Sequence, residues 1–203
     1  MTATIVFGLS GPSCSGKTTV ALNLLKLFPQ TIVIHQDDFY KPDNQIPVNE
    51  ALRIQDWDCP TSFDMQAMVK SIRSLRKQFQ STIAMNNATD IKDIQSHFAS
   101  QWANPPEDVE KVVDTVVLES LRKMILQFLQ IDSLELVPFY IILVDGILLF
   151  HDSEQNAIHP CAEFDAGIFI YAQYGTLKER REARAGYATK EAEFELPDVS
   201  NAR

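Results

Sequence analysis

The chain has 203 residues, of which 45% are hydrophobic and 22% are charged, a composition typical of a globular protein with one buried core. Its formal net charge of −9 argues against an extended nucleic-acid surface, which would be basic, although one focused basic pocket could still bind a phosphorylated substrate. The longest apolar run, residues 137–144, is too short to span a bilayer. We therefore expect a single domain over residues 1–203, with neither a nucleic acid nor a membrane as partner.

The three cysteines, Cys14, Cys59 and Cys161, are widely spaced and form no C-x-x-C pair. This usage predicts a reducing compartment and no structural zinc. Because no basic segment precedes the first apolar run, a signal peptide is not expected either. The protein is therefore predicted to be cytoplasmic, with the nucleus as a further compartment, and the sequence leaves open whether it is a monomer or an oligomer.

The first element is an apolar, β-branched run at residues 4–9, which predicts a buried strand. Residues 11–19 follow it and read Gly-Pro-Ser-Cys-Ser-Gly-Lys-Thr-Thr, which fits the phosphate-loop pattern G-x-x-x-x-G-K-[ST]. A helical pattern at residues 20–27 comes next and is closed by Pro29. A chance match in a turn is the alternative, but a strand before the motif and a helix after it are the context that phosphate binding needs.

In such a loop the glycines let the backbone amides approach phosphate oxygens at a helix N-terminus. Lys17 is expected to reach the β- and γ-phosphates, and the Thr18 hydroxyl to bind magnesium. The whole motif is therefore predicted to bind ATP, through Gly11, Pro12, Ser13, Cys14, Ser15, Gly16, Lys17, Thr18 and Thr19.

A second short strand is predicted at residues 31–34, and Asp37 and Asp38 come just after its carboxyl end, where ligands bind in open α/β sheets. Such an acidic pair is often only a helix cap or a loop ligand. Beside a phosphate loop, however, phosphoryl transfer to an alcohol needs a carboxylate that accepts the hydroxyl proton. We choose Asp37 as the candidate base, close enough to magnesium to bind it directly or through water.

The stretch from residue 41 to residue 60 is polar and contains prolines, so it is predicted to be loop. Within it, Trp57 and Asp58 could be an anchoring core residue with a neighbouring acid, or a flat platform beside a carboxylate that binds sugar hydroxyls. Thr61 or Ser62 is expected to cap a helix with apolar positions up to Leu75. An irregular or helical insertion is predicted at about residues 80–130, with an exposed excursion at 80–106 and a helix at 107–130.

A third buried strand is predicted at residues 139–144, and it ends in Asp145 and Gly146. A hydrophobic run followed by Asp commonly accompanies a phosphate loop, so we expect Asp145 to hold magnesium opposite Thr18; the alternative is a simple turn aspartate. A fourth strand is predicted at residues 166–171. Strands that alternate with helices predict a parallel sheet flanked by helices, an α/β fold of the P-loop NTPase type.

The segment after the fourth strand is a basic helix at residues 177–184, with Lys178, Arg180, Arg181 and Arg184. It could be a solvated face whose charges pair with neighbouring glutamates. Arginines also stabilise the charge that phosphoryl transfer spreads over the moving group. With Gly186 as a hinge, we favour a lid at about residues 175–190 that closes over ATP.

With residues 11–19, 36–42, 54–60, 145–150 and 180–187 in this order, the chain resembles the nicotinamide riboside kinases, and most of all their fungal members. The Asp-Asp-Phe-Tyr element also occurs in uridine kinases, whereas the Gln-x-Trp-Asp element and the spacing to the lid narrow the choice. The resemblance covers about residues 4–187. It implies ATP- and Mg²⁺-dependent phosphorylation of the 5′-hydroxyl of nicotinamide riboside for NAD synthesis, with nicotinic acid riboside as a second substrate.

The resemblance also assigns roles to single residues. It implies a catalytic set of Asp37, Lys17 and Arg181, and a metal set of Thr18, Asp37 and Asp145. Further ATP contacts are implied for Arg180, Arg184 and Tyr187. The nucleoside is expected to lie among Asp37, Asp38, Phe39, Tyr40, Trp57, Asp58, Arg181 and Tyr187. In this set Asp58 and Arg181 bind the ribose, and Trp57 and Tyr187 enclose the pyridine ring.

Residues 188–203 are polar and contain no strand-like run. Members of the family continue after the lid with a further strand and helix, so we expect the sheet to lack its C-terminal edge strand and helix. Two alternatives stay open beside the riboside kinase. One is another small-molecule kinase, similar to uridine or pantothenate kinase, and the other is a catalytically inactive nucleotide-binding protein.

Overall fold

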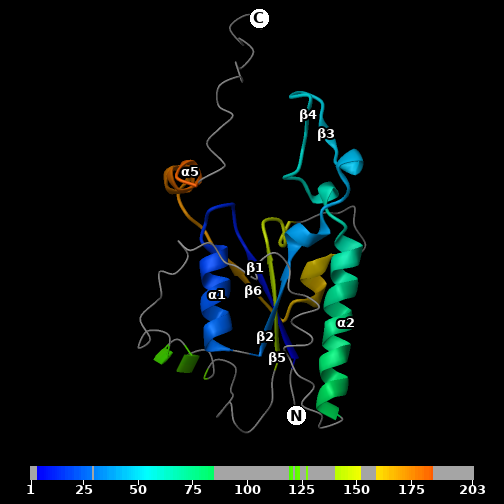
Figure 1. The fold of residues 1–203 in the computed structure, drawn as a ribbon, viewed down its shortest axis with the longest axis vertical. Helices are drawn as coiled ribbons and strands as arrows, with labels where there is room; N and C mark the ends of the chain where they lie inside the picture. The colour runs from blue at the N-terminus through cyan, green and yellow to red at the C-terminus, as the bar shows by residue number, and fades with distance from the viewer. Residues whose placement is uncertain are drawn as a thin grey trace, which may run out of the picture.

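The computed structural model describes residues 4–28, 30–84, 119–120, 122–123, 127, 140–151 and 159–184. The strands and helices within these ranges form a single layered arrangement (Figure 1). The exposed excursion expected at 80–106 starts too early, because residues 80–84 are still part of the long helix α2 (Met65–Ala84). The rest of the excursion, most of the expected helix at 107–130, and the tail at 188–203 lie outside the described residues. Residues 119–120, 122–123 and 127, which fall within the expected helix, are helical.

A four-stranded parallel sheet organises the molecule, in the order β2-β5-β1-β6. Its strands are β1 (Thr4–Ser10), β2 (Thr31–His35), β5 (Tyr140–Gly146) and β6 (Ala166–Phe169). The helices are α1 (Lys17–Leu27), α2 (Met65–Ala84) and α5 (Tyr174–Glu182). The expected α/β fold with a parallel sheet flanked by helices is confirmed. Its division into domains stays a prediction.

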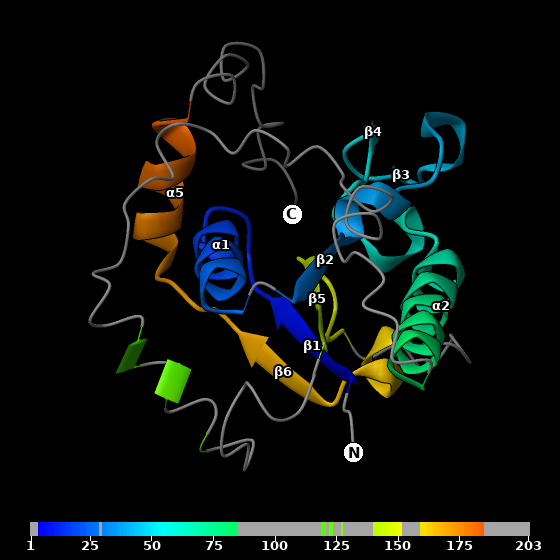
Figure 2. The same cartoon turned by 60° about the horizontal axis from the view of Figure 1, so that its bottom comes forward.

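Helices cover both faces of the sheet, with α1 on one side and α2 on the other (Figure 2). The face toward α2 buries most of the core, including Val6, Ile142, Met68, Ile72 and Phe79. A smaller cluster of Leu9, Ala21 and Leu143 packs toward α1. β5 is buried along its whole length, which explains its continuous apolar sequence. β6 is the outer strand, and Ile168 and Phe169 are exposed on it.

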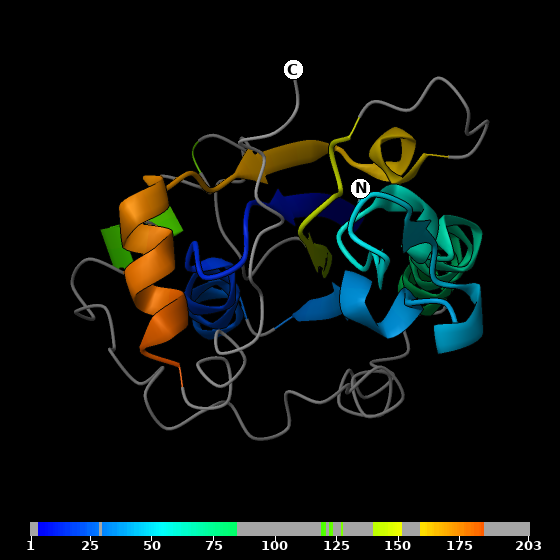
Figure 3. The ribbon, with the colours of Figure 1, turned by 90° about the horizontal axis from the view of Figure 1, so that it is seen from above.

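The carboxyl ends of the strands all meet at one edge of the sheet, because the strands are parallel. Seen from above this edge, the loop between β1 and α1 lies between α5 on one side and the segment after β2 on the other (Figure 3). In the register of the sheet, Asp145 is paired with Leu9 of β1 and with His35 of β2. The phosphate loop, the segment that carries Asp37 and the segment that follows Asp145 therefore leave the sheet at the same level.

The sequence predicts loop from residue 41 to residue 60. In the structure this stretch is not loop throughout. It contains a short antiparallel hairpin of β3 (Val48–Asn49) and β4 (Ile54–Gln55). The Asn49 side chain closes the turn, since its Oδ1 accepts hydrogen bonds from the amides of Ala51 and Leu52, each at 3.1 Å. Strands of two residues are too short to show a hydrophobic period.

The cap of α2 also differs from the prediction of Thr61 or Ser62. Asp64 precedes the helix, and its Oδ1 accepts a hydrogen bond from the Ala67 amide at 2.9 Å, the geometry of an N-cap. Ser62 is buried, and its hydroxyl donates to the carbonyl of Asp56. The helix starts later than expected because Phe63 still pairs with Tyr40 in an antiparallel bridge.

Two predicted boundaries near the C-terminal end of the described chain also shift. The fourth strand ends at Phe169 rather than at residue 171. The helix expected at residues 177–184 begins earlier, at Tyr174, and ends at Glu182. None of the described helices combines the length and the apolar character needed to cross a membrane.

Asp165 ties three elements together just before β6. Its Oδ2 accepts hydrogen bonds from the Val6 amide at 2.8 Å and from Arg76 Nη2 at 3.0 Å. Its own amide donates to the Val6 carbonyl at 2.8 Å. The carboxylate thus joins β1 to the start of β6 and to α2.

We expect Asp165→Ala to lower the free energy of unfolding by about 1–2 kcal/mol, because the Val6 amide loses its acceptor and Arg76 loses its anion. Urea unfolding followed by circular dichroism measures this change. Lys70→Gln, on the exposed side of α2, is the control and should change the stability by less than about 0.5 kcal/mol. Equal stability of the Asp165 variant and the wild type would contradict the prediction.

Candidate active site

The loop from Gly11 to Gly16 joins β1 to α1 and has the backbone of an anion cradle. Gly11 and Gly16 have φ angles of 151° and 103°, which favour glycine over residues with a Cβ. A Cβ on Gly11 would also collide with the Ile170 carbonyl of the neighbouring segment. The loop is closed by a hydrogen bond from the Ser15 amide to the Pro12 carbonyl at 3.2 Å. The loop leads into the N-terminus of α1, where an anion is favoured.

Lys17, the first residue of α1, folds back over this loop. Its Nζ donates hydrogen bonds to the carbonyls of Gly11 at 2.9 Å and Pro12 at 3.1 Å. Burial lowers the pKa of the Lys17 ammonium, and the charges of Asp145 and Asp37 act in the opposite direction. A lysine in this environment is held close to the phosphate cradle by contacts that a phosphate oxygen could replace.

Asp37 approaches the same place from the end of β2. It lies in the 3-10 helix Gln36–Phe39, where Asp37 and Asp38 are both exposed. Enclosure of its carboxylate raises the pKa of Asp37, and the nearby charge of Asp145 raises it further, while Lys17 opposes the change. The structure thus brings Lys17, Asp37 and Asp145 together.

Asp145 is 7% exposed and lies at the end of the central strand β5. Its Oδ2 is 3.5 Å from His35 Nδ1, whereas its Oδ1 is buried and has no hydrogen-bond partner among the described residues. A buried carboxylate oxygen left in this way suits a cation or a cation-bound water. The charge and the buried oxygen without a partner make Asp145 a candidate metal ligand.

The oxygen donors of this site fit magnesium. The Thr18 hydroxyl and the carboxylates of Asp37 and Asp145 are the hard ligands that Mg²⁺ prefers, and substrate phosphates and water usually complete its shell. Within the described ranges there is no group of three or more His, Cys, Asp or Glu side chains that could hold a metal ion. These residues would therefore hold magnesium together with a phosphate rather than alone.

Phe39, Tyr40 and Trp57 form an aromatic wall next to Asp37. Phe39 and Tyr40 are half-buried against the main core. The Tyr40 ring lies 4.1 Å from that of Phe63 and 5.4 Å from that of Trp57, which it meets edge-on at 69°. Trp57 itself is 37% exposed. It is thus anchored on Tyr40 and still offers part of its surface to solvent.

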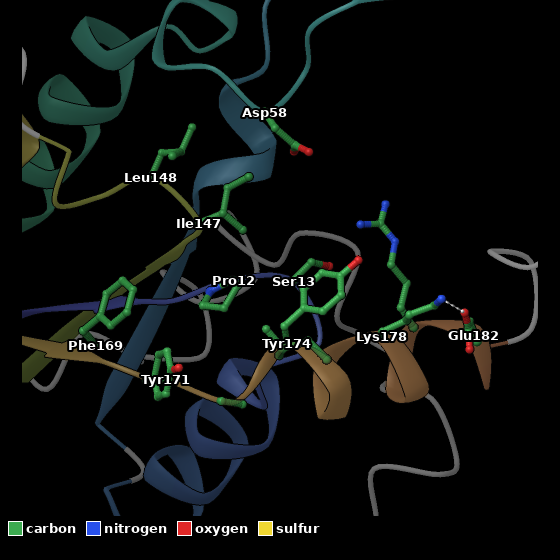
Figure 4. A pocket seen from close by; sticks show the side chains of 13 residues that line it. Pro12, Ser13, Asp58, Ile147, Leu148, Phe169, Tyr171, Tyr174, Lys178 and Glu182 are labelled. Atoms are coloured by element: carbon green, nitrogen blue, oxygen red, sulfur yellow. Dashed lines mark ion pairs between the residues drawn. The ribbon is translucent and has the colours of Figure 1, made fainter. Parts of the chain in front are cut away.

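An open cleft of about 1250 Å³ lies between the phosphate loop and α5 (Figure 4). Asp58 lines it from the loop beyond the β3–β4 hairpin, and Arg181 lines it from α5. Asp58 and Arg181, the two residues expected to bind the ribose, are 123 positions apart in the sequence, and both line this cleft. The rest of the wall is formed by Pro12, Ser13, Ile147, Leu148, Phe169, Tyr171, Ala172, Tyr174, Leu177, Lys178 and Glu182.

The basic residues of α5 divide between two environments. Arg180 Nη1 donates long hydrogen bonds to the carbonyls of Cys14 at 3.4 Å and Ser15 at 3.5 Å, and the charge of Arg184 lies close enough to Lys17 to lower its pKa further. Lys178 instead forms an ion pair with Glu182 at 3.5 Å on the cleft side. Tyr187 and the expected hinge at Gly186 lie outside the described residues.

Part of the cleft wall was not predicted from the sequence. Ile147 and Leu148 lie in the segment 145–150, which contributes to the resemblance but indicates no role for them, and the sequence indicates no role for Tyr171 and Tyr174. A usable signal was present for the two tyrosines, because they come directly after a strand, at the edge of the sheet where ligands bind. Both are strongly exposed, at 77% and 80%.

Comparison with known proteins finds related kinases. No protein-family model matches the chain. The nicotinamide riboside kinase of Saccharomyces cerevisiae is 30% identical over 187 residues, which cover 91% of this chain and 67% of the relative. That of Schizosaccharomyces pombe is 29% identical over 195 residues, or 96% of this chain and 72% of the relative. A uridine kinase of Leuconostoc citreum is 26% identical over 153 residues, or 73% of this chain and 55% of the relative.

The electrostatics of Asp37 predict how its substitution affects stability. Because the pKa of Asp37 is raised in the folded state above its ordinary value of 3.8, its ionised form destabilises the fold at neutral pH. Asp37→Asn should therefore be more stable than the wild type at pH 7. The difference should shrink as the pH falls through the raised pKa and vanish below about 3.8. Urea unfolding across this pH range measures it, and an Asn variant that is less stable at pH 7 would contradict the assignment.

Proposed function

The chain belongs to the nicotinamide riboside kinase family, and we propose that it transfers the γ-phosphoryl group of ATP to the 5′-hydroxyl of nicotinamide riboside. The product would be the mononucleotide used in NAD synthesis. Nicotinic acid riboside, which has the same ribose and a similar ring, is proposed as a second substrate. The proposal assigns the parts of this reaction to individual residues of this chain.

The observation that carries the proposal is the meeting of Lys17, Asp37 and Asp145 beside a cleft lined by Asp58 and Arg181. A phosphate cradle, a base and an alcohol-binding pocket are the three parts that phosphoryl transfer to a sugar requires. They come from β1, β2 and β5, from the segment after the β3–β4 hairpin, and from α5.

In this proposal, the loop amides and Lys17 hold the triphosphate, and Asp37 accepts the proton of the 5′-hydroxyl. A carboxylate whose pKa is raised by enclosure is a stronger base than one in water, provided that it is ionised at the working pH. Arg180 and Arg184 approach the phosphate loop and would neutralise the charge that develops on the moving group. Thr18, Asp37 and Asp145 would hold the magnesium ion, which neutralises charge on the phosphates when bound.

The nucleoside is proposed to occupy the cleft with its ribose between Asp58 and Arg181. The pyridinium ring would lie against Trp57, since a cationic ring is attracted to an aromatic face. Asp38, Phe39, Tyr40 and Tyr187 complete the proposed substrate set. Phe39 and Tyr40 act through packing, because they are half-buried and Tyr40 supports Trp57.

A direct assay tests the proposal. Purified protein, ATP and Mg²⁺ are incubated with nicotinamide riboside, nicotinic acid riboside or uridine, and the products are separated by chromatography. We expect both pyridine ribosides to be phosphorylated and uridine to react poorly, since the matching uridine kinase covers less of the chain at lower identity. Turnover of uridine alone would reject the proposed substrate, and ATP binding without turnover of any nucleoside would reject the proposed activity.

The phosphate loop gives a second expectation. Lys17→Met should lower kcat by about 10²-fold or more, because it removes a charge aimed at the transferred group. Lys26→Met is the matched control, as Lys26 is an exposed residue in the last turn of α1, and it should leave kcat unchanged. Steady-state kinetics with nicotinamide riboside measures both, and similar activities of the two variants would contradict the role of Lys17.

Trp57→Ala should raise KM for nicotinamide riboside by about 2- to 30-fold, the range expected when a cation loses an aromatic face. The KM for uridine should change less, because its base is uncharged. Trp57→Phe keeps an aromatic face next to Tyr40 and should recover most of the affinity. An equal rise in both KM values would show that Trp57 acts only through the packing of its loop.

A further inference from the structure

Gln36 stands between the last residue of β2 and Asp37, and it is the most deeply buried polar side chain next to the site, with 0% exposure. Glutamine is seldom fully buried unless its amide is hydrogen-bonded. Neither phosphate binding nor the lining of the cleft accounts for the full burial of this side chain. The contacts of its amide oxygen provide an explanation, while its amide nitrogen has no hydrogen-bond partner among the described residues.

The side chain of Gln36 reaches across to the segment that follows β5. Its Oε1 accepts hydrogen bonds from the amide of Ile147 at 2.9 Å and from the amide of Leu148 at 3.0 Å. These two residues line the cleft (Figure 4). From the other side, the Ser10 hydroxyl donates to the Ile147 carbonyl at 3.3 Å. The amide oxygen of Gln36 thus holds the backbone of Ile147 and Leu148 from one side, and the Ser10 hydroxyl supports it from the other.

Gly146 shows how closely the two segments approach. A Cβ at this position would collide with the Oε1, Cβ and Cδ atoms of Gln36. Only a residue without a side chain lets the end of β5 pass so near to Gln36. The contact between them therefore fixes the distance between the segment that carries Asp37 and the segment that carries Ile147 and Leu148.

We propose that Gln36 is a positioning residue, which holds the Ile147–Leu148 wall of the cleft in register with Asp37. It touches neither the phosphate loop cradle nor the cleft itself, and it acts through the amides that it accepts from. The expected consequence falls on the nucleoside and not on ATP, because Ile147 and Leu148 belong to the cleft wall. The kinetic part of this inference rests on the proposed function, whereas the structural part does not.

Gln36→Met tests the inference, because methionine has a similar length and volume but no oxygen for the two amides. We expect KM for nicotinamide riboside to rise by about tenfold or more, since a cleft wall that has lost both hydrogen bonds must be ordered when the nucleoside binds. KM for ATP should stay close to that of the wild type. Gln66→Met, on the exposed side of α2, is the matched control and should change neither value.

Two further variants separate positioning from general damage. Gln36→Glu keeps an acceptor oxygen for both amides and should recover the nucleoside KM, even where the added charge beside Asp37 lowers kcat. Gly146→Ala leaves Gln36 unchanged but displaces it, so it should raise the nucleoside KM as Gln36→Met does. It also carries the test if the Met variant fails to fold. Equal KM values for the Met variant and the wild type, or no recovery by Glu, would overturn the proposal.

A measurement without substrate distinguishes this inference from the proposed function. Hydrogen exchange at the amides of Ile147 and Leu148 should be slow in the wild type and in Gln36→Glu, and faster in Gln36→Met, because only the Met variant leaves both amides without an acceptor. Unchanged exchange in the Met variant would overturn the positioning role whether or not the riboside is a substrate. Faster exchange in a protein that does not phosphorylate the riboside would support that role and reject the proposed function.

Discussion

The register in which β5 pairs with β1 and β2 sets the position of Asp145 relative to the phosphate loop and to the segment that carries Asp37. Asp145 lies level with Leu9 and His35, so the end of β5 faces the start of the phosphate loop on one side and the end of β2 on the other. Slipping β5 by one residue would turn Asp145 to the opposite face of the sheet and bury it away from Lys17. The continuous burial of β5 makes such a slip costly, because every side chain of the strand is packed. β5, which is buried along its whole length, therefore also determines where Asp145 lies.

The charges gathered by this register work against the stability of the fold. Burial disfavours the charged form of Lys17, and the carboxylates of Asp37 and Asp145 repel one another. The opposite charge of Lys17 compensates for part of this, and the hydrophobic core on the α2 face supplies the remainder of the stability. A divalent cation bound together with a phosphate would offset the repulsion between the two carboxylates.

Much of the fold could be predicted from the sequence because its signals are local. The buried strands at residues 4–9, 31–34 and 139–144 are continuous apolar runs, and the phosphate loop is a contiguous motif. The features that were missed depend on contacts between distant residues or on very short elements. The amides that Gln36 binds are 111 and 112 positions away, so no pattern near Gln36 indicates its role. The N-cap at Asp64 was missed because the bridge between Tyr40 and Phe63 delays the start of α2.

The last feature of the site is the way in which α5 is attached to the phosphate loop. None of the residues of α5 is buried, and the contacts described between its basic residues and the phosphate loop are the two long hydrogen bonds from Arg180. Arg184 and Lys17 repel one another across the same space. A triphosphate bound in the loop would lie among these three cations and replace their repulsion with attraction. Because Arg181 on the same helix lines the cleft, the helix proposed to contact ATP also forms one side of the proposed nucleoside pocket. In the proposed function, α5 would therefore link the binding of the two substrates, whereas Gln36 acts on the nucleoside side of the site.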